Sequence, residues 1–245
     1  MRELIILIGG LLPFFCSAIG IDSMLNFTEK GKTEFKVSSN SSYREFIKVG
    51  ISELHVKDGE VVKVPYSREN IDKWSLLVRP ARAVIEPSLS KLFTVEHVAS
   101  KGSLSKQDHA YQLSIIPTPY FAEGEPVSHS VSIAMGFAPV VIVPAEEDKP
   151  LNYRIQYQNG GVRIKNNGGT YLRAVLDTCA DDTLEDERES CTSVSYVLSG
   201  RNLPIQLSDK MKSAKKINVN LSTHKYTYKT ALTLKPEQVV ESERH

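Results

Sequence analysis

The chain has 245 residues, enough for one or two domains, since domains commonly hold about 100–150 residues. Hydrophobic residues make up 41% of it and charged residues 24%, as in ordinary folded proteins. The 30 basic and 29 acidic residues leave a net charge of +1, which gives no electrostatic reason to expect binding to nucleic acid or to a membrane surface.

An apolar stretch opens the chain and runs from Leu4 to Ile19 without a charged residue. Its length fits the core of a signal peptide and is short for a membrane-spanning helix. Ala18 and Gly20 supply small residues for a cleavage site. We therefore expect residues 1–20 to be a signal peptide and the mature chain to begin near Ile21. An uncleaved membrane anchor is one alternative. A lipoprotein that carries its lipid on Cys16 is another, but Phe14 and Phe15 stand where that signal needs small residues.

Short alternating or β-branched runs between turn residues dominate the rest of the chain, and no stretch keeps a 3.6-residue apolar period. This pattern predicts an all-β fold built from sandwiches, with Asp58-Gly59 as a tight hairpin turn and a frayed polar tail after Pro236. The predicted strands, in chain order, are Glu34–Val37, Glu45–Ile51, Val61–Val64, Leu76–Val78, Lys91–His97, Tyr111–Ile116, Val131–Val143, Tyr153–Tyr157, Gly161–Lys165, Tyr171–Leu176, Ser193–Leu198, Lys216–Leu221 and Tyr226–Leu234.

The strand Val131–Val143 carries the most information about function. Side chains alternate between the two faces of a strand, so one face is nearly bare and the other carries bulky apolar groups. Such a strand either packs its bulky face into a core or lies at a sheet edge that another protein uses, where added main-chain hydrogen bonds and side-chain pockets bind the partner. The four bulky residues are Val131, Ile133, Met135 and Phe137.

A charged segment between Pro144 and Pro150 follows this strand and indicates a linker or a sharp corner. It divides the chain into residues 21–144 and residues 150–245, each about the size of one seven-stranded sandwich. We therefore predict two immunoglobulin-like β-sandwich domains.

Removal of the leader leaves two cysteines, Cys179 and Cys191, on either side of a short acidic segment. An even cysteine count in an exported protein favours a disulfide, and two cysteines without a nearby histidine pair make a poor zinc site. Two separate thiols are the alternative.

Nothing in the sequence indicates catalysis. Motifs for phosphate, dinucleotide and zinc-protease sites are missing, and so is the G-x-S-x-G motif of serine hydrolases. The six histidines are scattered. We expect no enzyme activity, no metal and no cofactor.

The order of these features resembles the periplasmic chaperones of chaperone–usher pili, in particular the alternate, common-pilus-like branch. The resemblance covers most of the chain from Ile21 to about Leu207, and rests on the order of its segments. Those segments are IDSMLNFTEKGKTEFKVSSNSSYREFIKVGI, LLVRPARAVIEP, HAYQLSI, GFAPVVIVP and NGGVRIKNNGGTYLRAVLDTC.

The resemblance implies an L-shaped pair of sandwiches in the periplasm that binds incomplete pilus subunits, both pilins and tip adhesins. The chaperone lends them a strand and delivers them to an outer-membrane usher. Val131, Ile133, Met135 and Phe137 would then insert into the subunit. An exposed apolar row would also favour self-association of the free chain.

The family also anchors the subunit's terminal carboxylate with basic residues in the cleft between the domains. Lys36 matches one such position, although an ordinary exposed strand lysine is an equal interpretation. The strand Val131–Val143 lacks the second basic residue, which departs from the family pattern. Arg79 and Arg82 are the remaining candidates, with solvated edge charges as their alternative role.

Two other functions stay open. A two-domain pilus subunit or adhesin would carry an alternating apolar extension at its mature N-terminus, and Ile21–Lys30 fits that poorly. A secreted enzyme on a β-sandwich would need a catalytic or metal cluster formed only by folding.

Overall fold

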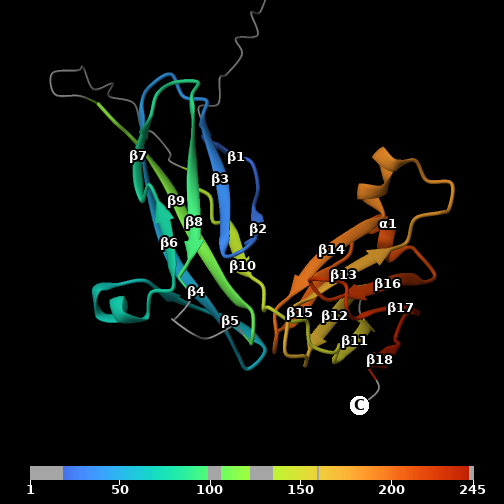
Figure 1. Cartoon of the computed structure of the whole chain (residues 1–245). Coiled ribbons are helices and arrows are strands. Elements are labelled where there is room, and N and C mark those ends of the chain that lie inside the picture. The colour runs from blue at the N-terminus through green and yellow to red at the C-terminus, as the bar shows by residue number, and fades with distance from the viewer. Residues whose placement is uncertain (1–18, 99–105, 122–134, 159, 243–245) are drawn as a thin grey trace, which may run out of the picture.

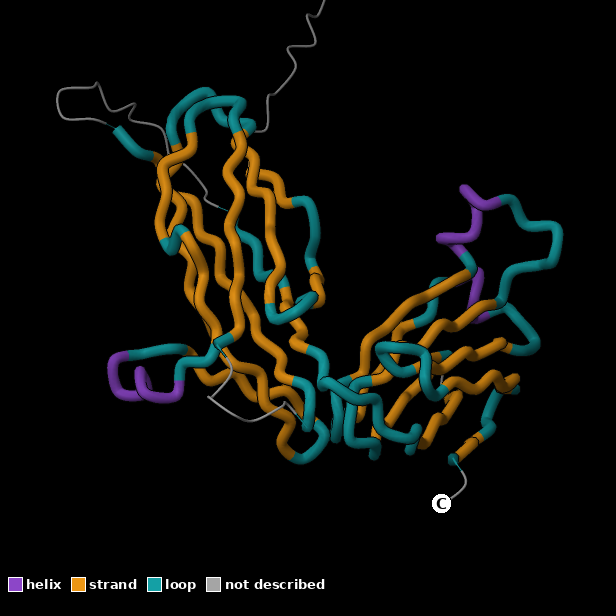
Figure 2. The backbone as a smooth tube through the Cα atoms, viewed as in Figure 1, coloured by secondary structure: helices purple, strands orange, loops and turns teal. Residues whose placement is uncertain are grey.

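The computed structural model describes residues 19–98, 106–121, 135–158 and 160–242. Its strands form two β-sandwiches, which confirms the predicted fold class. Figure 1 shows the sandwiches joined by one connection and set at an angle, as an L. Figure 2 shows that strands make up most of both, while the few helical turns lie at the periphery.

The N-terminal sandwich consists of two sheets. Sheet A has the strand order β1-β3-β8-β6, and sheet B has the order β2-β10-β9-β4-β5, with β7 also pairing with β4. The elements are β1 Ile19–Ile21, β2 Leu25–Phe27, β3 Lys32–Ser39, β4 Glu45–Lys57, β5 Glu60–Pro65, the 3-10 helix η1 Arg68–Lys73, β6 Leu76–Arg79, β7 Arg82–Ile85, β8 Ser90–His97, β9 His109–Pro119 and β10 Val140–Val143.

The C-terminal sandwich is built in the same way. Sheet C has the order β15-β12-β11-β18, and sheet D has the order β14-β13-β16-β17. The elements are β11 Tyr153–Gln158, β12 Gly161–Asn166, β13 Leu172–Asp177, the 3-10 helix η2 Glu185–Ser190, β14 Thr192–Val197, β15 Asn202–Gln206, α1 Asp209–Lys212, β16 Ile217–Ser222, β17 Lys229–Leu234 and β18 Val239–Glu241.

Period-two patterning explains how these strands pack. In β9, Tyr111, Leu113 and Ile115 face the core of the N-terminal sandwich and are fully buried, while polar residues alternate with them in the first half of the strand. The β4–β5 hairpin turns at Asp58-Gly59, where both residues have positive φ (53° and 80°), as the sequence predicts.

The chain changes sheets near its beginning. β1 pairs antiparallel with β3 in sheet A, whereas β2 pairs parallel with β10 in sheet B. Residues 22–24 therefore cross from one sheet to the other. Of these two strands, β2 pairs with β10, the last strand of the sandwich.

Every predicted strand overlaps an observed one, but two expectations need correction. The strand Val131–Val143 is observed as β10 only, with a single isolated bridge at Phe137, and residues 131–134 lie outside the described residues. The tail after Pro236 is not frayed throughout, because β18 pairs with β11. The sequence also failed to predict five short strands, namely β1, β2, β7, β15 and β18.

The predicted leader overlaps the described structure by two residues. Ile19 and Gly20 belong to β1, and the Ile19 side chain is only 4% exposed, within the core of the N-terminal sandwich. Residues 1–18 lie outside the described residues. None of the helices that the structure describes is long and apolar enough to cross a membrane.

Candidate functional site

One edge of sheet B is only partly covered. The Phe137 N–H donates to the Ile115 carbonyl at 3.0 Å, and the Ile115 N–H donates back at 2.9 Å, so residues around Phe137 continue the pairing of β10 with β9. On the opposite side, the Val140 N–H donates to the Met24 carbonyl at 2.9 Å, and β2 then follows β10 toward the linker.

The chain N-terminal to Val140 therefore has a strand partner on its β9 side alone, as far as the described residues extend. Because main-chain groups alternate in direction along a strand, those of Gly136 and Ala138 point away from β9. Within the part of the chain that the structure describes, the Ala138 carbonyl accepts one long bond of 3.4 Å, from the Gln112 Nε2. An edge of this kind can accept a further strand.

The two described residues of the predicted apolar row differ in their exposure to solvent. Met135 is 74% exposed, whereas Phe137 is half-buried and packs against the core of the N-terminal sandwich. Val131 and Ile133 lie outside the described residues. A partner strand would meet Met135 directly, while part of the Phe137 side chain already serves this chain's own core.

The three basic candidates do not converge. Lys36 lies on β3, on the outer face of sheet A opposite the buried Phe35 and Val37. Arg79 lies on the same outer face in β6 and pairs with Glu96 at 3.1 Å. Arg82 belongs to β7 in the other sheet, where it stands opposite Lys48.

The junction between the sandwiches is built from sheet B and its connections. Ala110 and Ile142 of sheet B form a buried cluster with Tyr171 of the C-terminal sandwich. Phe27 stacks on Tyr171 with ring centroids 5.4 Å apart and meets Tyr196 edge-on at 5.2 Å. The sequence carries no signal for this cluster, because its members lie far apart along the chain.

Two hydrogen-bonded groups complete the junction. Asp108, just before β9, accepts the Ala145 N–H at 2.7 Å and also the Tyr171 N–H. Burial raises the pKa of the Asp108 carboxyl, against the opposing effect of these two bonds. The Tyr171 hydroxyl lies 2.6 Å from the His224 Nδ1, and burial raises the pKa of this phenol.

Cys179 and Cys191 form a disulfide, as predicted, with their Cα atoms 5.1 Å apart. The bond closes the acidic segment that contains η2. Beside it lies an open cavity of about 530 Å³ lined by Asp186, Glu187, Glu189, Ser190 and Lys210.

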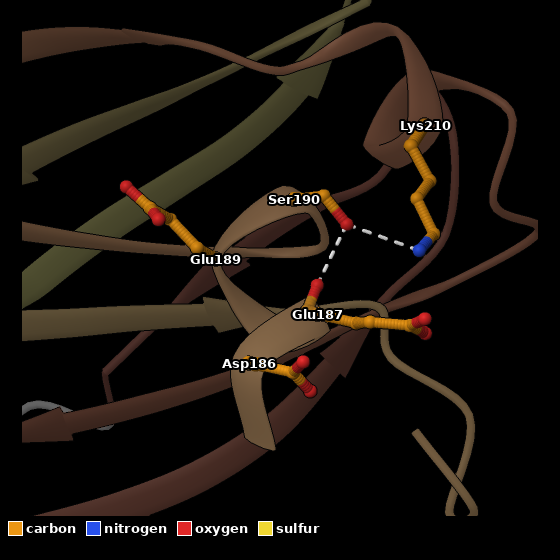
Figure 3. A pocket seen from close by; sticks show the side chains of 5 residues that line it. All are labelled: Asp186, Glu187, Glu189, Ser190 and Lys210. Atoms are coloured by element: carbon orange, nitrogen blue, oxygen red, sulfur yellow. Dashed lines mark hydrogen bonds between the residues drawn. The ribbon is translucent and has the colours of Figure 1, made fainter. Parts of the chain in front are cut away.

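Figure 3 shows that the Glu189 side chain points away from those of Asp186 and Glu187, while the Lys210 Nζ donates to the Ser190 Oγ at 3.0 Å. The cavity therefore lacks the convergent polar groups of a ligand site. Within the part of the chain that the structure describes, no three His, Cys, Asp or Glu side chains gather as metal ligands would.

Comparisons with known proteins agree with this architecture. An uncharacterized 25.9 kDa protein of Escherichia coli, from the CS5 3' region, is 38% identical over 77 residues, which cover 31% of this chain and 34% of that protein. The chain thus spans about a third of the length of this curated relative.

Three solved structures share the fold over nearly the whole chain. The class 5 fimbriae chaperone CfaA is 15% identical, with a TM-score of 0.51, and the match covers 90% of this chain and 99% of that one. A chain of a chaperone–tip adhesin complex from CFA/I fimbriae biogenesis is 14% identical, with a TM-score of 0.51, over 89% and 98% of the two chains.

The third is a chain of the CsuC–CsuE chaperone–tip subunit complex of Acinetobacter baumannii, which is 12% identical with a TM-score of 0.50 over 90% and 100% of the two chains. At these identities the likeness shows the two-sandwich fold of fimbrial chaperones. A family model described as the CS5 fimbrial protein N-terminal domain matches residues 21–144, half of the chain. The chain therefore belongs to the family of the CS5 fimbrial protein N-terminal domain.

Proposed function

We propose that this chain is a periplasmic chaperone that captures pilus subunits by lending them the open edge of sheet B and then delivers them to an outer-membrane usher. The observation that carries the proposal is the edge at Gly136–Ala138, paired with β9 on one side only and flanked by the exposed Met135. Family membership and the chaperone fold of its structural relatives support it.

The proposed capture requires only surface and main-chain chemistry. A subunit strand laid along Gly136–Ala138 would gain main-chain hydrogen bonds, and Met135 would fill an apolar pocket of the subunit together with Val131 and Ile133. Burying each such side chain contributes about 1.5–3 kcal/mol before the costs of association and ordering are subtracted. Phe137 would support the strand from the side of the chain's own core.

The test is periplasmic co-expression with a pilin encoded nearby, followed by pull-down and mass measurement of the complex. We expect a one-to-one complex that is lost on Met135→Asp or Ile133→Asp. The matched control is Ile71→Asp, because Ile71 is similarly exposed (61%) but lies on η1, away from the edge.

Three outcomes decide the proposal. Loss of the complex with the two edge variants but not with the control supports strand lending. Equal capture by all three variants removes the edge from the mechanism. A folded wild-type protein that retains no pilin would favour a pilus subunit or another two-domain binding protein instead.

A further inference from the structure

The two sandwiches are joined by more than the linker. Asp108 touches two segments at once: one carboxylate oxygen accepts the Ala145 N–H from the linker, and the other accepts the Tyr171 N–H from the C-terminal sandwich. Tyr171 is itself buried and stacks on Phe27 of β2. A single side chain therefore connects the start of β9, the linker and the loop before β13.

A second attachment lies at the tip of the β4–β5 hairpin. There the Asn202 N–H donates to the Gly59 carbonyl at 2.9 Å, and the Arg201 Nη1 donates to the same carbonyl at 2.8 Å and pairs with Glu60. One contact point would leave the C-terminal sandwich free to pivot. Two points, with the apolar cluster at Phe27, fix its direction.

β9 links this junction to the open edge. It begins next to Asp108, and six residues further on Ile115 holds Phe137 through two hydrogen bonds. Displacement of the C-terminal sandwich at Asp108 would leave the pairing of Phe137 with Ile115 intact. It would change the position of the C-terminal sandwich relative to the open edge. A subunit that contacts both the open edge and the C-terminal sandwich would require a fixed orientation between the two sandwiches.

We propose that Asp108 is a positioning residue that sets the angle between the sandwiches, and with it the position of the C-terminal sandwich relative to the open edge of sheet B. The part that concerns the subunit rests on the function proposed above. The part that concerns the angle belongs to the free protein and can be measured without any partner.

The decisive variant is Asp108→Asn. Its amide oxygen can accept one of the two N–H groups, but its NH₂ group then faces the other, so two donors meet. Asp108→Glu keeps both acceptor oxygens on a longer side chain. The matched control is Asp148→Asn, which makes the same charge change in the linker but acts on Thr223, Lys225 and Thr227 within the C-terminal sandwich.

The experiment measures the relative orientation of the sandwiches in the free protein, from residual dipolar couplings and small-angle scattering, and pilin affinity by titration. We expect Asp108→Asn to broaden the orientation and weaken pilin binding about tenfold, while the signals of both sandwiches keep their folded pattern. Asp108→Glu should partly restore the wild-type orientation and pilin affinity, and Asp148→Asn should change neither the orientation nor the affinity.

An unchanged orientation in Asp108→Asn overturns the proposal. If the wild type binds no pilin, the function above fails, while the orientation measurement still decides the role of Asp108. If Asp108→Asn does not fold, hydrogen exchange of the backbone amides in the wild type is measured instead of the orientation of the variant. A shared opening of the Ala145 and Tyr171 amides supports the proposal, and independent exchange of these amides contradicts it.

Discussion

Gly136 lies directly against the main chain of Ile115. A Cβ atom added at Gly136 would stand 2.5 Å from the Ile115 carbonyl oxygen, closer than real Cβ contacts come. The next residue, Phe137, makes both hydrogen bonds to Ile115. The open edge of sheet B therefore depends on a residue without a side chain at this position.

We expect Gly136→Ala to push this edge away from β9 and to lower the free energy of unfolding by about 1–3 kcal/mol. Urea denaturation measures the loss. Gly50→Ala is the matched control, since a Cβ there would meet the Ser114 Cβ at an ordinary 3.6 Å. Equal stability of both variants would show that the edge relaxes without cost.

Two aspartates near the linker should respond to acid in opposite directions. Burial of Asp148 acts to raise its pKa, but bonds from the Thr223 hydroxyl and from the Lys225 and Thr227 N–H groups outweigh burial and lower the pKa. A lowered pKa stabilises the fold above about pH 3.9, the ordinary Asp value, and this contribution is lost as the pH falls through the folded-state pKa.

The pKa of Asp108 shifts in the opposite direction, because burial raises it in the folded state. The nearby His224 acts against that rise, and Asp148 adds to it. The contribution of Asp108 to the free energy of unfolding falls as the pH rises from about 3.9 through the raised value. Denaturation curves between pH 3 and 6 should therefore lose acid sensitivity in Asp148→Asn and gain it in Asp108→Asn. Parallel pH profiles would contradict this assignment.

The disulfide should stabilise the C-terminal sandwich without taking part in capture. Cys179 and Cys191 are 12 residues apart, and closing a loop of this size contributes about 3 kcal/mol in the chain-entropy model. The variant with both cysteines changed to Ser should unfold at lower denaturant but still bind pilin. Weaker pilin binding at full stability would place the disulfide loop in the binding surface.

The strand β1 bears on the cleavage site of the predicted signal peptide. Ile19 is buried against the core and pairs with Ser39, so we expect cleavage after Ala18 and a mature protein that retains Ile19. Intact-mass measurement of the periplasmic protein decides this point. A form beginning at Asp22 should be less stable by about 1.5–3 kcal/mol for the loss of Ile19 alone. Equal stability of the two forms would make β1 dispensable.

Lys36→Ala tests the carboxylate anchor. We expect weaker pilin binding with unchanged stability, because the Lys36 side chain lies on the exposed outer face of β3. Lys32→Ala is the control on the same strand and face, where the lysine pairs with Glu96 at 3.3 Å. Identical pilin affinity of Lys36→Ala and wild type would remove Lys36 from the anchor.

Local patterns predicted the long strands and the disulfide because both leave a signal in nearby residues. Alternation in Tyr111–Ile116 identifies β9 directly, and Asp58-Gly59 identifies the turn of the β4–β5 hairpin. β2 and β18 have only three residues each and become strands through pairing with β10 and β11, which no local pattern records. Asp108 could not be predicted as part of the junction, since its partners are main-chain groups 37 and 63 residues away.

The parallel pairing of β2 with β10 also constrains the order of folding. Leu25 and Val140 are neighbours in space but lie at opposite ends of the N-terminal sandwich sequence. Contacts of such long range form slowly, because the intervening chain must be ordered first. As the chain emerges from the ribosome or a membrane pore, sheet B cannot be completed before Val143 appears. The edge proposed to receive a subunit is thus among the last parts of this sandwich to form.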